Sequence, residues 1–151
     1  MTEKGKPSIE ATIDSAEKLF NSGFNCAESV LLSIAKHYGI EDPPVPRIAT
    51  AFGGGMSRRQ MTCGALSGGL MSIGLIKGRD SGKEKSDPAY SLGGELIDYF
   101  ASKNRSTNCR EIVGLDFNNH AEHEQFRANE RNTICVPMVR DVCGWLLQRL
   151  S

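Results

Sequence analysis

One stretch of the sequence decides the fold: residues 62–77, which read TCGALSGGLMSIGLIK. We predict a helix from about Cys63 to Lys77, with Thr62 as its cap. Each interior glycine costs such a helix about 1 kcal/mol relative to alanine. A helix this rich in glycine, alanine and serine is worth forming only if its backbone lies very close to something. The sequence therefore predicts a second helix or a bound group packed directly against it.

Apolar residues recur at helical spacing on both sides of this stretch. Ser8 or Ile9 begins the first amphipathic helix. Asn25, with Glu28 three residues later, matches the capping box that starts many helices. The other expected helices cover about residues 9–20, 25–38, 45–52, 88–104 and 135–150, with a short turn or helix at 109–115 and a further surface helix within 116–129.

The chain of 151 residues has a length that suits one domain with one core. It contains no convincing strand alternation, no internal repeat and no second core. The expected fold is therefore all-α, a single-domain bundle of about five to six helices. We expect this domain to span residues 8–151 and to follow a flexible tail, residues 1–7.

Charge and hydropathy exclude several classes of partner. Lysine plus arginine and aspartate plus glutamate number 18 each, so no net charge favours nucleic acid or an anionic membrane. No apolar run reaches the roughly 18–20 residues of a membrane-spanning helix. The N-terminus lacks the apolar segment of a signal peptide. We expect a cytoplasmic protein.

Five cysteines in a protein of a reducing compartment favour redox chemistry or metal binding over structural disulfides. Cys26, Cys63 and Cys135 each fall at an expected helix start, where free N–H groups and the helix dipole favour a thiolate. Cys109 lies in the irregular stretch that follows the helix at 88–104. We expect Cys63 to be the most reactive thiol. Cys143 lies on an apolar helix face and is expected to be core packing.

Glycines accompany these cysteines. Gly53, Gly54 and Gly55 predict a loop with unusual backbone angles that shapes access to Cys63. Together with Gly64, they would let the backbone approach a bound group closely.

Cationic side chains near these motifs carry weaker signals. Arg58 and Arg59 follow the glycine run, where solvated side chains are the expectation and anion binding is the alternative. His120 and His123 form an H-x-x-H pattern on a polar segment. This spacing could bind a metal on a helix, but we expect both side chains to be exposed on the surface.

The order of these motifs resembles the C_GCAxxG_C_C family of redox proteins. The resemblance rests on Asn25-Cys26-Ala27-Glu28, Phe52-Gly53-Gly54-Gly55-Met56, Cys63-Gly64-Ala65-x-x-Gly68-Gly69, Asn108-Cys109-Arg110-Glu111-Ile112-Val113-Gly114 and a lone Cys135. It implies a small helical protein whose four family cysteines are Cys26, Cys63, Cys109 and Cys135. The family is also related to the non-haem module of split-Soret cytochromes, in which an iron–sulfur centre accompanies haem.

Three functions compete at this point. The first is an iron–sulfur protein for electron transfer or sensing, in which the four cysteines bind the cluster. The second is a thiol–disulfide redox protein using the same cysteines. The third is a structural zinc module, although close C-x-x-C pairs are absent. No C-x-x-C-H motif occurs, so covalently attached haem is not expected. The expected partner is a redox protein of unknown identity, and a homodimer is left open.

Overall fold

The computed structural model describes residues 5–42 and 44–150, which form helices and connecting loops. The longer helices are α1 (Ile9–Asn21), α2 (Cys26–His37), α4 (Gly64–Lys77), α5 (Asp87–Asn104) and α8 (Val136–Arg149). The shorter elements are α3 (Pro44–Arg47), the 3-10 helix η1 (Thr50–Phe52), α6 (Cys109–Val113), α7 (His120–Gln125) and the π-helix η2 (Phe126–Cys135). The predicted all-α class is confirmed. Most of the predicted tail, residues 1–4, lies outside the described residues.

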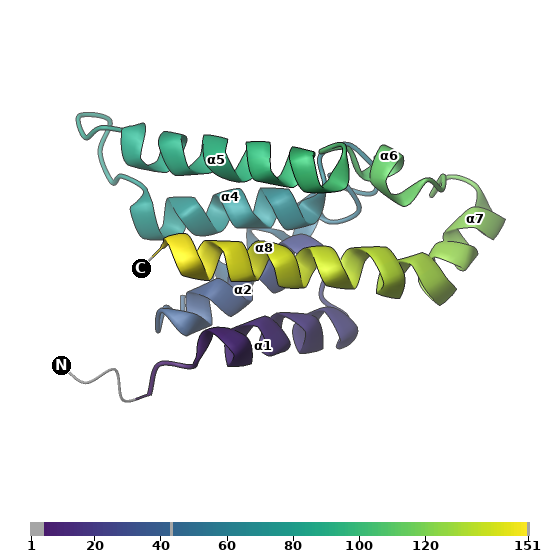
Figure 1. Cartoon of the computed structure of the whole chain (residues 1–151), viewed down its shortest axis with the longest axis horizontal. Coiled ribbons are helices and arrows are strands. Elements are labelled where there is room, and N and C mark those ends of the chain that lie inside the picture. Colours follow the sequence, from purple (N-terminus) through teal and green to yellow (C-terminus); the bar gives the residue numbers. More distant parts are fainter. Residues whose placement is uncertain (1–4, 43, 151) are drawn as a thin grey trace.

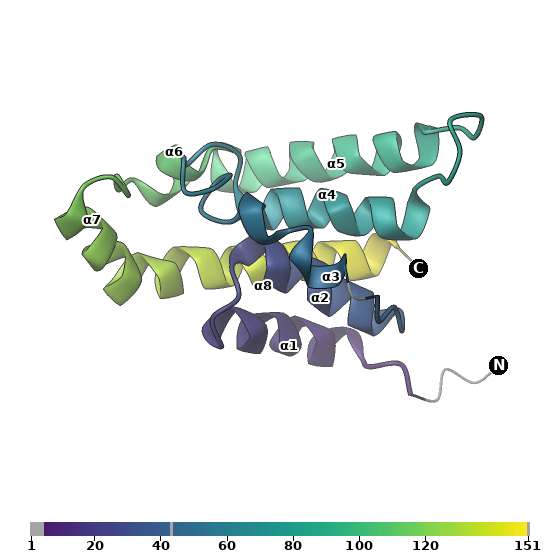
Figure 2. The ribbon, with the colours of Figure 1, turned by 180° about the vertical axis from the view of Figure 1, so that it is seen from behind.

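Helices α2 and α4 form the centre of the bundle, with α1 and α8 packed on one side and α5 on the other (Figures 1 and 2). The predicted close neighbour of α4 is α2. A Cβ atom added at Gly68 would lie 2.5 Å from the carbonyl oxygen of Ala27. Gly69 makes similar room for the side chains of Leu96 and Val142. The glycines of α4 thus let α2, α5 and α8 pack closely against it.

Apolar side chains from every long helix fill the space between the helices. The largest fully buried ones are Leu31, Ile34, Leu66, Ile73, Leu96, Phe100, Leu146 and Leu147. Burying one such side chain contributes about 1.5–3 kcal/mol relative to leaving it in water. All but Leu31 belong to one core, and Leu31 packs with Ala27 and Ala49 in a smaller cluster. These contacts hold the ends of the helices, and therefore the cysteines, in place.

The C-terminal helix is longer than predicted. The sequence predicts a start near Cys135, but α7, η2 and α8 follow one another without a break from His120 to Arg149 (Figure 1). No proline or glycine lies between His120 and Val136, so nothing in this stretch interrupts the helical backbone. The middle of this continuous helix, residues 126–135, takes the wider π-helical turn, a feature that is frequent at functional sites.

The helix predicted at 45–52 is also not continuous. Val45 has extended backbone angles, φ −98° and ψ 126°, within α3. The cause is Pro46, because a residue before proline is disfavoured in the α region. Ala49 is buried, whereas Ile48 is 56% exposed, so the expected apolar face forms only in part.

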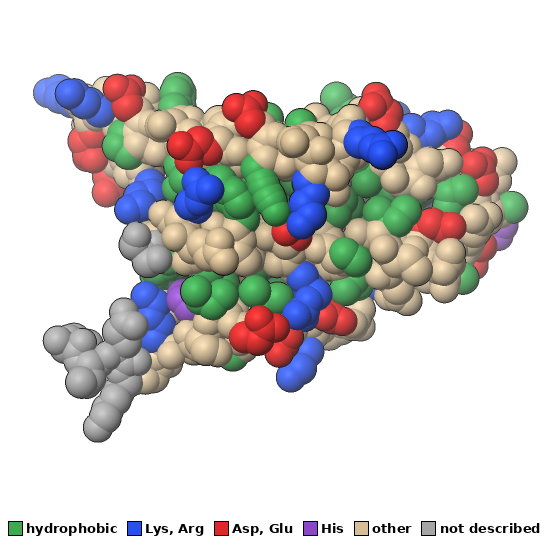
Figure 3. All heavy atoms as spheres, in the orientation of Figure 1, with side chains coloured by type: hydrophobic (Ala, Val, Ile, Leu, Met, Phe, Trp, Pro, Cys, Tyr) green, Lys and Arg blue, Asp and Glu red, His purple; other side chains and the backbone are tan. Residues whose placement is uncertain are grey.

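The surface in Figure 3 carries acidic and basic side chains intermingled over the helices, as the balanced composition suggests. Across the described part of the chain, no helix combines the length and the hydropathy needed to cross a membrane.

Candidate functional site

Cys26 is the first residue of α2, and a hydrogen-bonded cap holds this helix start. Asn25 Oδ1 accepts a hydrogen bond from the Glu28 N–H (2.8 Å), and Glu28 Oε1 accepts one from the Asn25 N–H (2.9 Å), so the predicted capping box is confirmed. Glu28 Oε2 accepts a further bond from the Thr50 hydroxyl (2.8 Å). Peptide N–H groups of the first helical turn and of Gly54 hydrogen-bond the Cys26 sulfur. The helix start therefore favours a thiolate at this position.

A short antiparallel contact places Cys63 beside Cys109. The Cys63 N–H donates to the carbonyl of Thr107 (2.8 Å), and the Cys109 N–H donates to the carbonyl of Met61 (2.6 Å). Thr62 lies between them in an isolated β-bridge, and Cys63 takes the cap position of α4. The prediction that Thr62 caps this helix is wrong, because pairing across the two loops displaces it from that position.

Gln60 lies at the end of the loop that begins with Gly53, Gly54 and Gly55, and we call residues 53–60 the glycine loop. Gln60 connects this loop to the segment that follows Cys109. Its side chain is buried, its Nε2 donates to the carbonyl of Leu115 (2.7 Å), and its Oε1 accepts from the N–H of Phe117 (2.8 Å). Its side chain also hydrogen-bonds Cys109, the first residue of α6. Burial raises the pKa of Cys109 to about 12, and the negative charge at Cys26 acts in the same direction, whereas the bond to Gln60 opposes the rise.

Cys135 is not at a helix start, contrary to the sequence-based expectation. It is the last residue of the π-helix, within the continuous helix from His120 to Arg149. The N–H groups that a helix start would leave free therefore donate to carbonyl oxygens of the preceding turn. Burial is the main cause of its raised pKa, followed by the negative charges at Cys26 and Cys109. The nearby Arg131 partly opposes this rise.

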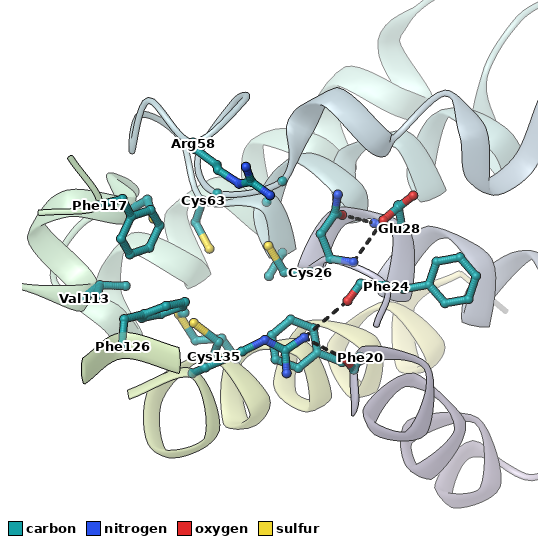
Figure 4. A pocket seen from close by; sticks show the side chains of 18 of the residues that line it. Phe20, Phe24, Cys26, Glu28, Arg58, Cys63, Val113, Phe117, Phe126 and Cys135 are labelled. Carbon is teal, nitrogen blue, oxygen red and sulfur yellow. Dashed lines mark hydrogen bonds between the residues drawn. The ribbon is translucent and has the colours of Figure 1, made fainter. Parts of the chain in front are cut away.

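The four cysteines line one cavity of about 570 Å³ although they come from separate parts of the chain. Cys26 and Cys63 approach it from one side and Cys135 from the opposite side (Figure 4). All of them are free thiols; Cys63, Cys109 and Cys135 are buried, while Cys26 is partly exposed. The structure therefore brings together the four cysteines that the sequence singled out, and it places Cys143, which was expected to be core packing, elsewhere.

Cys26 and Cys63 form an unequal pair of thiols. Hydrogen bonding from the Cys63 thiol and from peptide N–H groups lowers the pKa of Cys26 to about 7, although burial acts in the opposite direction. The pKa of Cys63 is raised well above its usual value, first by this same hydrogen bond and then by burial. The expectation that Cys63 is the most reactive thiol is therefore not supported, since the geometry favours a thiolate at Cys26.

The predicted glycines lie against the cysteines. Gly54 and Gly55 have φ angles of 62° and 68°, the left-handed region that favours glycine. A Cβ atom at Gly55 would lie 2.6 Å from the Cβ of Cys109, and one at Gly64 would collide with the sulfur of Cys26. A Cβ at Gly53 would collide with the side chain of Asn25. These positions are left without side chains where the cysteines and their supporting residues need the space.

Cys143 lies in the core, away from the cavity. It is fully buried in α8, and its sulfur is 3.3 Å from the hydroxyl oxygen of Ser33. Burial raises its pKa to about 12.

Replacing this residue, Cys143→Ala, should lower the free energy of unfolding by about 1–2 kcal/mol, because it removes one small buried group. Urea titration followed by circular dichroism measures this change. The reactivity of the other four thiols and the metal content of the protein should stay unchanged. Loss of a bound metal or of Cys26 reactivity in this variant would contradict our placement of Cys143 outside the site.

Three further residues of the cavity region were missed in the sequence. Gln60 had no distinguishing pattern, because its bonds to Leu115 and Phe117 join residues 55 and 57 positions away. Arg131 lies over the ring of Phe20, 3.6 Å from the ring centroid, and donates to the Phe20 carbonyl (2.7 Å). His123 was expected on the surface but lines the cavity beside Phe117. Only the H-x-x-H spacing could have drawn attention to it.

The fold and the cavity together define a class of protein: a helical bundle that gathers four cysteines from distant segments around one cavity. The family model described as "Putative redox-active protein (C_GCAxxG_C_C)" matches residues 24–149. This match covers most of the chain, and the chain belongs to that family. No curated protein and no solved structure matches the chain.

Proposed function

We propose that Cys26, Cys63, Cys109 and Cys135 hold an iron–sulfur cluster through which this protein transfers or senses electrons. The observation that carries this proposal is that four thiols from four elements line a single cavity. Four cysteine thiolates are the usual ligand set of [2Fe–2S] and [4Fe–4S] clusters. When bound, such a cluster would supply one-electron chemistry.

The two metal-binding candidates differ in how closely the donors must come together. Among residues 5–42 and 44–150, no three cysteine, histidine, aspartate or glutamate side chains come close enough together to hold a single metal ion. Zinc–sulfur bonds are about 2.3 Å, so a structural zinc would require the four sulfurs to close around one point. The cluster proposal rests on the four-cysteine ligand set that shares one cavity, and not on the spacing of the donors.

The surroundings suit a negatively charged group. Peptide N–H groups hydrogen-bond the sulfur of Cys26, and hydrogen bonds to sulfur are one means by which a protein tunes the reduction potential of a cluster. Arg131 brings a positive charge near Cys26 and Cys135. The rings of Phe117 and Phe126 line the same cavity and give it an apolar wall. We propose that a cytoplasmic partner protein exchanges electrons with this site.

A dithiol reaction is the second candidate, favoured by the unequal Cys26 and Cys63 pair. With a small disulfide such as oxidised glutathione, the Cys26 thiolate would attack one sulfur and release one glutathione thiolate. Cys63 would then lose its proton and attack the mixed disulfide at Cys26, releasing the second glutathione. One intramolecular disulfide forms, and one glutathione disulfide is reduced to two thiols.

Anaerobic purification followed by iron and acid-labile sulfide analysis tests the proposal. We expect brown protein with iron and sulfide in equal amounts. Changing any one of the four cavity cysteines to serine should remove most of the iron, while Cys143→Ala retains it. Colourless, iron-free protein that loses two free thiols on treatment with oxidised glutathione would establish the dithiol function instead. Stoichiometric zinc that persists under reductant would establish the zinc module.

A further inference from the structure

The outer part of the cavity carries a group of positive charges that the four thiols do not explain. Arg58 and Arg127 line it beside the ring of His123, and these three residues come from the loop that follows Gly55, from η2 and from α7. Arg58 and Arg127 are exposed, whereas most of the thiols are buried, so these two arginines lie at the mouth and the sulfurs lie deeper. Figure 4 shows Arg58 above Cys63 and Cys26.

These positive charges are poorly neutralised. Within the part of the chain that the structure describes, no acidic side chain forms an ion pair with Arg58. Arg127 has only a loose contact with Glu124, at 3.6 Å between side chains that are both more than half exposed. Such an exposed pair contributes little. The pKa of His123 is lowered by burial and then by the charges of Arg127 and Arg58, which places the three groups near one another.

The acidic residue of the cavity is already engaged. Both carboxylate oxygens of Glu28 accept hydrogen bonds, from the Asn25 N–H and from the Thr50 hydroxyl. Glu28 is therefore committed to holding the start of α2. The mouth keeps like charges together, and an anion from outside would relieve their repulsion.

One wall beside these charges is aromatic. The rings of Phe117 and Phe126 lie 4.6 Å apart between centroids, and His123 lies 4.9 Å from Phe117. Both phenylalanines are only partly buried and line the cavity (Figure 4). A volume of about 570 Å³ falls within the range of small-molecule pockets, which combine apolar walls with a few polar anchors.

We propose that the mouth of this cavity binds a small organic anion with a flat, apolar body. Its anionic group lies against Arg58 and Arg127, and its body lies on Phe117 and Phe126. This site goes beyond the cysteine chemistry and does not depend on what the thiols hold. Its position makes it a place where a ligand reaches the edge of the redox site.

Calorimetric titration of the full-length protein tests the proposal with three probes: phenyl phosphate, inorganic phosphate and phenol. We expect phenyl phosphate to bind about tenfold or more tightly than either of the others, because only it uses both the charges and the aromatic wall. Arg58→Gln and Arg127→Gln should each weaken its binding about tenfold, the usual scale of one charge-assisted contact. Arg59→Gln is the matched control: this neighbouring exposed arginine does not line the cavity, and binding should not change.

Absence of phenyl phosphate binding, or an equal loss with Arg59→Gln, would overturn the proposal. Equal affinity for inorganic phosphate would overturn it as well, since the aromatic wall would then contribute nothing. Iron and sulfide are measured on the same samples. Iron-free protein that still binds phenyl phosphate would refute the cluster while supporting the anion site, so the two failures can be told apart.

Discussion

Gly68→Ala should lower the free energy of unfolding by about 3 kcal/mol, although alanine is the better helix former. The added methyl group would lie 2.5 Å from the carbonyl oxygen and 2.9 Å from the Cα of Ala27. These are backbone atoms of α2, so no side chain can rotate away and the two central helices must separate. Overpacking of this kind costs more than the roughly 1 kcal/mol that alanine gains in a helix.

Gly74→Ala provides the matched control for this substitution. Gly74 lies on the exposed side of the same helix, and a Cβ atom there would meet nothing within 4 Å. This variant should raise stability by about 0.5–1 kcal/mol through helix propensity alone. Urea unfolding of both variants measures the difference. If both substitutions stabilised the protein equally, the close packing of α2 on α4 would be refuted.

Brief iodoacetamide treatment of reduced, metal-free protein at pH 7 should label Cys26 more than tenfold faster than Cys63. The thiolate is the nucleophile, and a thiol with a pKa of about 7 is about half ionised at this pH. The pKa of Cys63 is raised well above its usual value by the hydrogen bond to Cys26 and by burial, so very little of this thiol is ionised. Cys26 is also the most exposed thiol of the cavity, which adds to the difference. Peptide mapping by mass spectrometry gives the order of labelling.

The pH dependence gives a second check on this pair. Labelling of Cys26 should rise with pH, reach half its maximum near pH 7 and level off above about pH 8, because its thiolate fraction is then nearly complete. Cys109 should continue to accelerate beyond pH 9, because its pKa is about 12. Faster labelling of Cys63 than of Cys26 at neutral pH would refute our reading of the pair and restore the sequence-based expectation.

Local patterns predicted well what neighbouring residues control. The capping box at Asn25 and Glu28 depends on residues three positions apart, so it was visible in the sequence. The left-handed backbone angles of Gly54 and Gly55 could also be predicted, because three consecutive glycines are visible in the sequence. The break at Val45 follows from the next residue, Pro46, and could have been predicted. The prediction of a helix at 45–52 followed the apolar spacing and gave Pro46 too little weight.

The continuous helix from His120 to Arg149 was missed for a different reason. Its middle part, residues 126–135, is mostly polar and takes a π-helical turn, so it lacks the apolar period that reveals an α-helix. This difference moved Cys135 from an expected helix start to the interior of a helix. The physical consequence is the loss of free N–H groups near its sulfur, which would have opposed the rise in its pKa that burial causes.

By itself, the sequence determined the helical class, the glycine-rich helix that must lie against a neighbour, and the four cysteines that line one cavity. These features follow from residue types and short spacings, which act through local sterics and hydrogen bonds. Only the tertiary structure decided which thiol is ionised and what surrounds it. The pKa of Cys26 is lowered and that of Cys63 is raised because a bridge at Thr62, a buried Gln60 and the packing of α4 on α2 bring distant segments together. Contacts between segments that lie tens of residues apart leave no local pattern in a chain.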